Sequence, residues 1–144
     1  TAIYGSNFPL GLLPFIFFVL ACAIAFATGT SWGTFGVLVP IAVTILGGSG
    51  TLALLTVSAT LGGAVFGDHI SPISDTTILA SAGAQCNHVN HVNTQLPYAI
   101  TVAAVSFVSY IIAGFVQNVY ISLAVAAVLT VATLFVIKKV TAKK

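Results

Sequence analysis

Two carboxylates stand out in a chain that is otherwise almost free of charge, because Asp68 and Asp75 are its only acidic residues. They lie in a stretch that also carries several hydroxyl groups. The hydroxyl groups belong to Ser71, Ser74, Thr76 and Thr77. Sodium is a hard cation that prefers carboxylate, hydroxyl and carbonyl oxygens, and burial favours the protonated form of a carboxyl group. We therefore predict that Asp68 and Asp75 bind Na+ and H+ in turn, with these hydroxyl groups as neutral ligands.

A solvated, idle pair of aspartates in an aqueous loop is the alternative, since this stretch is polar enough to lie in water. Against this alternative, a carboxylate at the middle of a bilayer costs at least about 2.5–3.5 kcal/mol and is rarely incidental. His69, next to Asp68, either relays a proton or only donates a hydrogen bond to a nearby carbonyl. The sequence leaves these two roles of His69 open.

Residues 28–34 form a second stretch of small and hydroxyl-bearing residues, in which Gly29 and Gly33 permit an unwound backbone. We predict that Thr30 and Ser31 bring uncharged oxygen ligands from this stretch to the same cation site. Small residues also permit close helix packing in membranes, and for this stretch taken alone that alternative stays open.

Cys86, His88 and His91 have a spacing that can bind zinc, but a fourth ligand is missing. Incidental histidines in a polar loop are therefore the favoured interpretation. No catalytic residue and no cofactor is expected, and the only metal predicted is Na+, which is transported together with H+.

The composition excludes a water-soluble domain, because 58% of the residues are hydrophobic and only 4% are charged. A soluble domain carries about 25% charged residues, whereas a bilayer needs no such cover for apolar surface. The net charge of +2 comes from a basic tail and not from a nucleic-acid-binding face. The lysines of the tail are Lys138, Lys139, Lys143 and Lys144. We predict a membrane transport domain over residues 1–137 and a cytoplasmic tail over residues 138–144, following the positive-inside rule.

The apolar segments predict an all-α integral membrane fold that is interrupted at the two polar stretches. Residues 10–46 are expected to form a re-entrant hairpin with its tip near Thr30. Residues 51–84 are expected to form one discontinuous helix, broken around residues 68–75. Broken helices at membrane depth are tolerated only where they face protein or a water-filled cavity, and secondary transporters place them at the ion site.

Two full transmembrane helices are expected after this region, over residues 96–116 and 120–137, and they follow a polar loop over residues 85–95. Counting back from the basic tail, residues 117–119 lie outside the cell and the polar loop lies in the cytoplasm. The hairpin then enters the membrane from outside.

Three motifs resemble signatures of the NhaC-type sodium/proton antiporters: residues 28–36 (TGTSWGTFG), 67–79 (GDHISPISDTTIL) and 95–99 (QLPYA). The resemblance implies a membrane exchanger of the wider ion-transporter superfamily, built from two inverted repeats, of which this chain would be the C-terminal one. The chain departs from the family in its polar loop, where charged residues are expected. Asparagines stand there instead, at Asn87, Asn90 and Asn93. It also supplies only about half of such a transporter.

The motifs and the resemblance together predict sodium/proton antiport across the cytoplasmic (inner) membrane, without enzymatic activity. A sodium- or proton-coupled organic acid antiporter of the malate/lactate type is the nearest alternative, and a non-transporting fragment is another. An intramembrane aspartyl protease is disfavoured, because Asp68 and Asp75 lie in one stretch and not on separate helices. The chain starts at Thr1 and contains no methionine, which predicts a fragment. Its expected partners are the lipid bilayer, the missing N-terminal half or an equivalent subunit, and small cations, but no nucleic acid.

Overall fold

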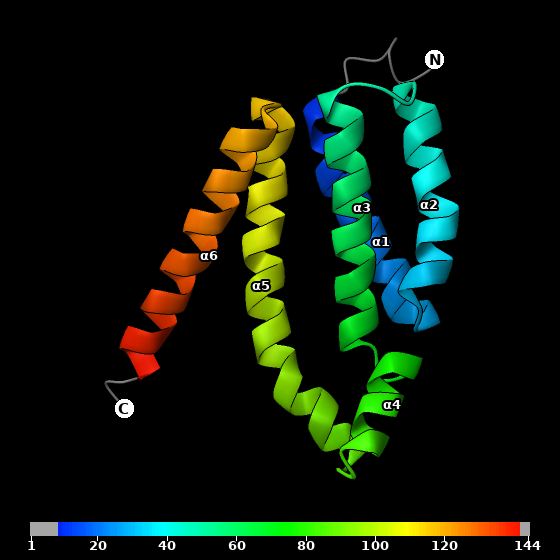
Figure 1. The fold of residues 1–144 in the computed structure, drawn as a ribbon, viewed down its shortest axis with the longest axis vertical. Coiled ribbons are helices and arrows are strands. Elements are labelled where there is room, and N and C mark those ends of the chain that lie inside the picture. Colours follow the sequence, from blue (N-terminus) through cyan, green and yellow to red (C-terminus); the bar gives the residue numbers. More distant parts are fainter. Residues whose placement is uncertain (1–8, 142–144) are drawn as a thin grey trace.

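The computed structural model describes residues 9–141, and every regular element in this range is helical (Figure 1). The elements are η1 (Leu10–Leu12), α1 (Leu13–Thr28), α2 (Ser31–Leu46), α3 (Thr51–Ile70), α4 (Asp75–Gly83), α5 (His88–Val116) and α6 (Val119–Thr141). Within this range, four helices are long and apolar enough to cross a membrane, and α2 is shorter. The predicted all-α membrane class is therefore confirmed.

Helix α3 approaches α1 so closely that two of its glycines face the α1 backbone. A Cβ atom added at Gly63 would collide with the carbonyl of Phe18, and one added at Gly67 would collide with the carbonyl of Cys22. Gly63 and Gly67 lie about one turn apart on one face of α3, a spacing that lets transmembrane helices pack closely. This packing fixes the last turn of α3, which carries Asp68, against α1.

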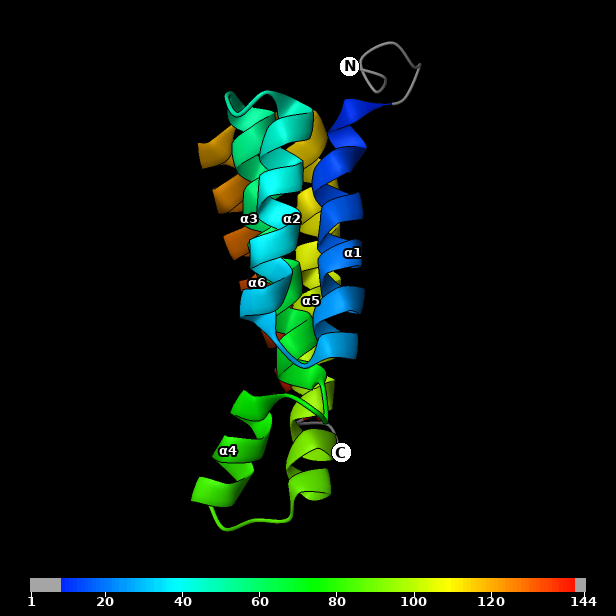
Figure 2. The same ribbon diagram turned by 90° about the vertical axis from the view of Figure 1, so that its right-hand side faces the viewer.

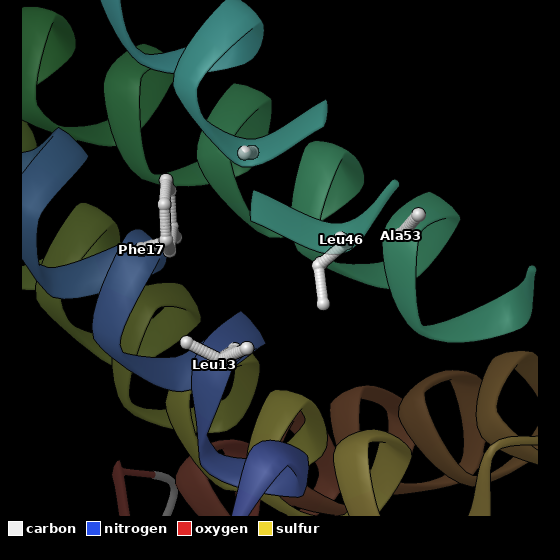
Figure 3. Close-up of a cluster of buried hydrophobic side chains, with 5 residues drawn as sticks. Leu13, Phe17, Leu46 and Ala53 are labelled. Carbon is white, nitrogen blue, oxygen red and sulfur yellow. The ribbon is translucent and has the colours of Figure 1, made fainter. Parts of the chain in front are cut away.

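Two clusters of buried apolar side chains fill the space between α1, α2 and α3. Figure 3 shows the first, in which α1, α2 and α3 contribute Leu13, Phe17, Ala42, Leu46 and Ala53. The second cluster contains Ala21, Ala25, Leu38 and Ala64. In a membrane such contacts stabilise by close packing, since lipid is as apolar as these side chains. The three helices therefore form one packed unit.

Helices α1 and α2 form the predicted hairpin, and their connection lies at Gly29 and Thr30. Gly29 ends α1 in the left-handed region at φ +68°, where glycine meets no steric penalty. Thr30 then caps α2, because its Oγ1 accepts a hydrogen bond from the N–H of Gly33 at 3.5 Å. Together with η1, α1 provides 19 residues, enough to cross a bilayer, whereas α2 has 16. Re-entrant insertion of this hairpin stays a prediction.

The predicted discontinuous helix is present as α3 and α4, which are separated by a linker of residues 71–74. The break is narrower than predicted, because Asp68 still belongs to α3, which has 20 residues. Pro72 explains why α3 ends before the linker: proline has no N–H to donate and disfavours helical geometry in the residue before it. Figure 2 shows that α4 leaves the axis of α3 and lies beyond the α1–α2 turn.

The segment predicted as a polar loop, residues 85–95, is helical from His88 onward, so this expectation is wrong for most of the segment. Asn87 determines where α5 begins, because its Oδ1 accepts a hydrogen bond from the N–H of Asn90 at 3.1 Å. The polar composition of the segment predicted a loop and gave no indication of this helix cap. Helix α5 thus has 29 residues, and its lower part, toward α4, bends away from the upper part (Figure 1). Pro97 lies within α5 and removes one backbone hydrogen bond there.

Helix α6 packs against α5 and continues past the predicted end of the last span, through Lys138 and Lys139. Lys143 and Lys144 lie outside the described residues. The division into a membrane domain and a cytoplasmic tail therefore stays a prediction.

Candidate cation site

Asp68 lies in the last turn of α3 and is buried, with 7% of its surface exposed. Its Oδ1 accepts a hydrogen bond of 2.6 Å from the hydroxyl of Ser74, which caps α4 from the other side of the linker. Ser74 itself has no exposed surface. The linker therefore folds back so that a hydroxyl at the start of α4 meets the carboxylate at the end of α3.

A short chain of hydroxyl groups continues from Ser74. The Oγ1 atom of Thr76 lies 2.7 Å from Ser74 Oγ. Because a hydroxyl has one proton and Ser74 donates its own to Asp68, Thr76 is the donor in this second bond. Thr77 is also buried, and its N–H donates to Ser74 Oγ at 3.5 Å. Of the predicted neutral ligands, Ser74 thus contacts the Asp68 carboxylate, and Thr76 and Thr77 contact Ser74.

Asp75 has a different environment, although the sequence pairs it with Asp68. It is the first residue of α4 and is exposed. Its Oδ1 accepts a hydrogen bond from the N–H of Thr76 at 2.9 Å, and its charge suits the positive end of the α4 dipole. Within the described part of the chain, no hydrogen bond joins Asp75 to Asp68.

The α1–α2 turn lies directly against the linker. The hydroxyl of Ser71 donates to the carbonyl of Phe26 at 2.8 Å. A Cβ atom added at Gly29 would lie only 2.7 Å from the carbonyl oxygen of Ile73. The two polar stretches that the sequence singled out are therefore neighbours in space, as Figure 1 also shows.

Thr30 and Ser31, the predicted ligands of the α1–α2 turn, are partly buried and buried, respectively. Within residues 9–141, neither side chain forms a hydrogen bond with Asp68. The hydroxyl oxygen of Thr30 instead caps α2. The backbone carbonyl of Thr30 accepts a hydrogen bond from the Thr34 hydroxyl at 2.9 Å. The structure thus brings the turn to the linker, but the Thr30 hydroxyl has a local partner in the N–H of Gly33.

Four helix ends meet in this region, and they carry partial charges of both signs. Helices α1 and α3 end here with their carbonyl groups, while α2 and α4 begin here with their N–H groups. No lysine or arginine precedes Lys138 in the chain, so no basic side chain of residues 9–137 balances the charge of Asp68. Such a region can accept a small cation or a proton without displacing a fixed positive charge.

Two residues of α5 that the sequence analysis did not assign to the site bind backbone carbonyls at the break. Gln95 Nε2 donates to the carbonyl of His69 at 2.7 Å, and His88 Nε2 lies 2.7 Å from the carbonyl oxygen of Pro72. Gln95 was visible only as part of a family motif. Gln95 lies two helical turns after His88, so the two side chains share one face of a helix, and this spacing could have indicated a joint role. The spacing has no such meaning in a loop, which is what the sequence predicted for this segment.

His69 is exposed, and its carbonyl is the atom that the structure ties to α5. A proton relay through its side chain stays a prediction. The zinc alternative at Cys86, His88 and His91 gains no support, since His88 contacts Pro72 and Ser81. Within residues 9–141, no three His, Cys, Asp or Glu side chains gather as a metal site.

The family model for the Na+/H+ antiporter family matches residues 2–115. An uncharacterized protein of Haemophilus influenzae is 49% identical over 96% of this chain. The malate-2H(+)/Na(+)-lactate antiporter of Bacillus subtilis is 36% identical over 80% of the chain, and the arginine/ornithine antiporter ArcD of Halobacterium salinarum is 39% identical over 72%. The chain spans 27%, 25% and 22% of the lengths of these relatives, respectively. No solved structure matches the chain.

The family match covers the α1–α2 turn, the linker and most of α5, which are the parts that meet around Asp68. The four apolar helices of the described region agree with a multi-pass membrane protein. The relatives with a named activity are secondary antiporters, as the helix break and the buried carboxylate also indicate. The chain belongs to the Na+/H+ antiporter family.

Proposed function

We propose that this chain provides the ion-binding part of an antiporter that exchanges sodium for protons across the cytoplasmic membrane. The observation that carries the proposal is the buried Asp68 carboxylate, which meets the Ser74 hydroxyl across a helix break. Because the chain spans about a quarter of its relatives, we assign exchange to the complete protein. A second, inverted repeat is the expected partner of this part.

In this proposal Asp68 holds either a proton or a sodium ion, but not both. When Asp68 is protonated, its burial costs little, because the carboxyl group is neutral. When it loses the proton, a sodium ion balances the charge and takes oxygen ligands from the hydroxyls of Ser71, Ser74, Thr76 and Thr77. The chain of hydroxyl groups suits this change, since each hydroxyl can rotate to offer a lone pair instead of a proton.

Three other residues assist the site without a hydrogen bond to Asp68 in the described part of the chain: Asp75, Thr30 and Ser31. Asp75 is exposed at the start of α4 and attracts cations to the site. Thr30 and Ser31 lie at the turn that contacts the linker, and they provide further oxygens if the turn and linker shift together. His69 either relays a proton to Asp68 or serves only through its backbone.

Exchange of organic solutes is the second candidate, because two relatives are named for it. A malate- or lactate-type anion needs a cationic contact, and the lysines of this chain all lie at its C-terminal end. A cationic amino acid, as named for the Halobacterium salinarum relative, fits the exposed Asp75 carboxylate better. Either solute would use the proton or sodium site at Asp68 as its coupling site.

Proteoliposomes with the complete protein separate these candidates. We expect sodium gradients to drive proton movement without any organic solute. Where protons compete with sodium for the site, each unit of acidification should raise the half-saturating sodium concentration about tenfold at an unchanged maximal rate, since one proton replaces one sodium ion. Proton movement that needs malate, lactate, arginine or ornithine would instead establish solute exchange.

A further inference from the structure

Helix α5 binds two backbone carbonyl groups at the helix break, one in the last turn of α3 and one in the linker, and the break leaves both without their usual helical partners. In a continuous helix, the carbonyl of His69 would accept from the N–H of Ile73. The break removes this bond, and Gln95 Nε2 donates to that carbonyl instead, at 2.7 Å. Backbone carbonyls within a membrane protein need such partners, because lipid offers none.

The second carbonyl belongs to Pro72 in the middle of the linker. A carbonyl oxygen can only accept, so His88 Nε2 carries the proton in the 2.7 Å contact with it. The other ring nitrogen, Nδ1, lies 3.0 Å from the hydroxyl oxygen of Ser81 in α4. Ser81 is buried, and the single proton of its hydroxyl goes either to this nitrogen or to the carbonyl of Ile78, 2.9 Å away within α4. His88 therefore joins α5 to the linker and to α4.

The two carbonyls that α5 binds lie between Asp68 and Ser74 in the sequence, and these two residues form the candidate cation site. Asp68 directly precedes His69, and Ser74 follows Pro72 after one residue. A shift of either carbonyl therefore moves one member of the Asp68–Ser74 pair relative to the other. Because the pair is joined by a single hydrogen bond of 2.6 Å, small displacements of the linker change it strongly.

We propose that His88 and Gln95 are positioning residues, which hold the linker so that Ser74 meets Asp68 and thereby set the affinity of the site for its cation. They act through the linker backbone and do not touch the cation. Helix α5 also links the site to the rest of the protein, since α6 packs along it. This inference rests on the proposed sodium/proton exchange at Asp68.

Four variants of the complete protein test the role of the donors. His88→Leu and Gln95→Met remove a donor at similar volume, whereas His88→Gln keeps an amide N–H near the position of Nε2. Gln95→Leu is a second apolar replacement, which removes the N–H group without adding a charge near the cation site. Two matched controls on α5 are His91→Leu and Asn93→Leu, because within residues 9–141 neither side chain forms a hydrogen bond.

We expect the variants without a donor to raise the half-saturating sodium concentration about three- to tenfold, the range of one hydrogen bond. Their maximal rate should change less than twofold, and His88→Gln should restore most of the affinity. A merely structural role would instead lower the amount of folded protein and the maximal rate at unchanged affinity. That result, or equal behaviour of donor-less variants and controls, would overturn the proposal.

Hydrogen–deuterium exchange separates this proposal from the exchange function on which it rests. Loss of either donor should speed amide exchange in the peptide that covers residues 69–77, and the control variants should leave it unchanged. If the wild-type protein moves no sodium but the linker still loosens, the proposed function fails and the positioning by α5 stands. If sodium exchange occurs but the linker is equally protected in all variants, the positioning fails alone.

Discussion

The hydroxyl of Ser74 lies 2.6 Å from a carboxylate oxygen of Asp68, although six positions separate the two residues. In a continuous helix, residues with this separation point to different faces, because each residue turns the helix by about 100°. The break at Pro72 is what allows them to meet. The site therefore depends on where α3 stops, and not only on which polar residues the stretch contains.

The difference in burial between the two aspartates predicts a difference between their variants. Asp68→Asn should reduce sodium-dependent proton movement at least about a hundredfold, because asparagine can accept the Ser74 hydrogen bond but cannot exchange a proton. Asp75→Asn should lower the rate only severalfold, since Asp75 is exposed and bonds only to Thr76 among the described residues. Transport rates in proteoliposomes measure both effects. Equal transport by Asp68→Asn and wild type would place the exchange site elsewhere.

Removal of the Ser74 hydroxyl affects both the helix and the site. Ser74→Ala deletes the α4 cap, which costs about 1 kcal/mol of stability, and it leaves the Asp68 carboxylate without its donor. We expect a lower unfolding temperature and weaker apparent sodium affinity. Ser74→Thr keeps the hydroxyl and should retain most of both properties. If Ser74→Ala loses stability but keeps its sodium affinity, Ser74 is a cap and not a ligand.

Much of the fold follows from hydropathy, because long apolar segments and their interruptions are visible in the sequence. Residues 28–34 and the break around residues 68–75 were predicted to contribute to one cation site, and the close approach of Gly29 to the carbonyl of Ile73 shows that the two stretches are neighbours. The pairing of Asp68 with Ser74 rather than with Asp75 was not predictable. It depends on the geometry of a linker that contains a proline, and neither periodicity nor composition encodes that geometry.

The start of α5 was missed for a different physical reason. A cap at Asn87 extends the helix through polar sequence that no apolar periodicity marks. As a result, His88 was interpreted as a loop residue, and its contact with Pro72 was not anticipated. Helix caps and single side-chain contacts to a broken backbone are local features, and they become visible only when the elements are placed in space.

The close approach of α1 and α3 predicts that small residues are required at their contact. Gly67→Ala would place a methyl group against the carbonyl of Cys22, which overpacks the contact by about 1–3 kcal/mol or more. We expect less folded protein and a displaced Asp68, seen as reduced thermal stability in detergent. Gly36→Ala is the matched control, because a Cβ atom there meets nothing within 4 Å. If both variants are equally stable, α1 and α3 do not pack as described.

The orientation of the chain in the membrane follows from charge and from the antiparallel packing of α5 and α6. Lys138 and Lys139 lie in the last turn of α6 and favour the cytoplasmic side. Since α5 begins at the same end of the molecule (Figure 1), Cys86, which is exposed just before it, should also face the cytoplasm. A membrane-impermeant thiol reagent should label Cys86 in everted vesicles but not in intact cells.

The test of orientation needs a reporter at the opposite end and a buried reference. Ser49→Cys places a thiol in the exposed α2–α3 turn and should react only from outside. Cys22 is half-buried within α1 and should react slowly from either side. All other cysteines of the complete protein are replaced. The thiols at positions 86 and 49 then report on the two membrane surfaces, and Cys22 reports on the protein interior. Labelling of Cys86 from outside together with Ser49→Cys from inside would mean that the chain is inserted in the reverse orientation. The α1–α2 turn and the linker would then lie toward the external side of the membrane, and sodium would reach Asp68 from that side.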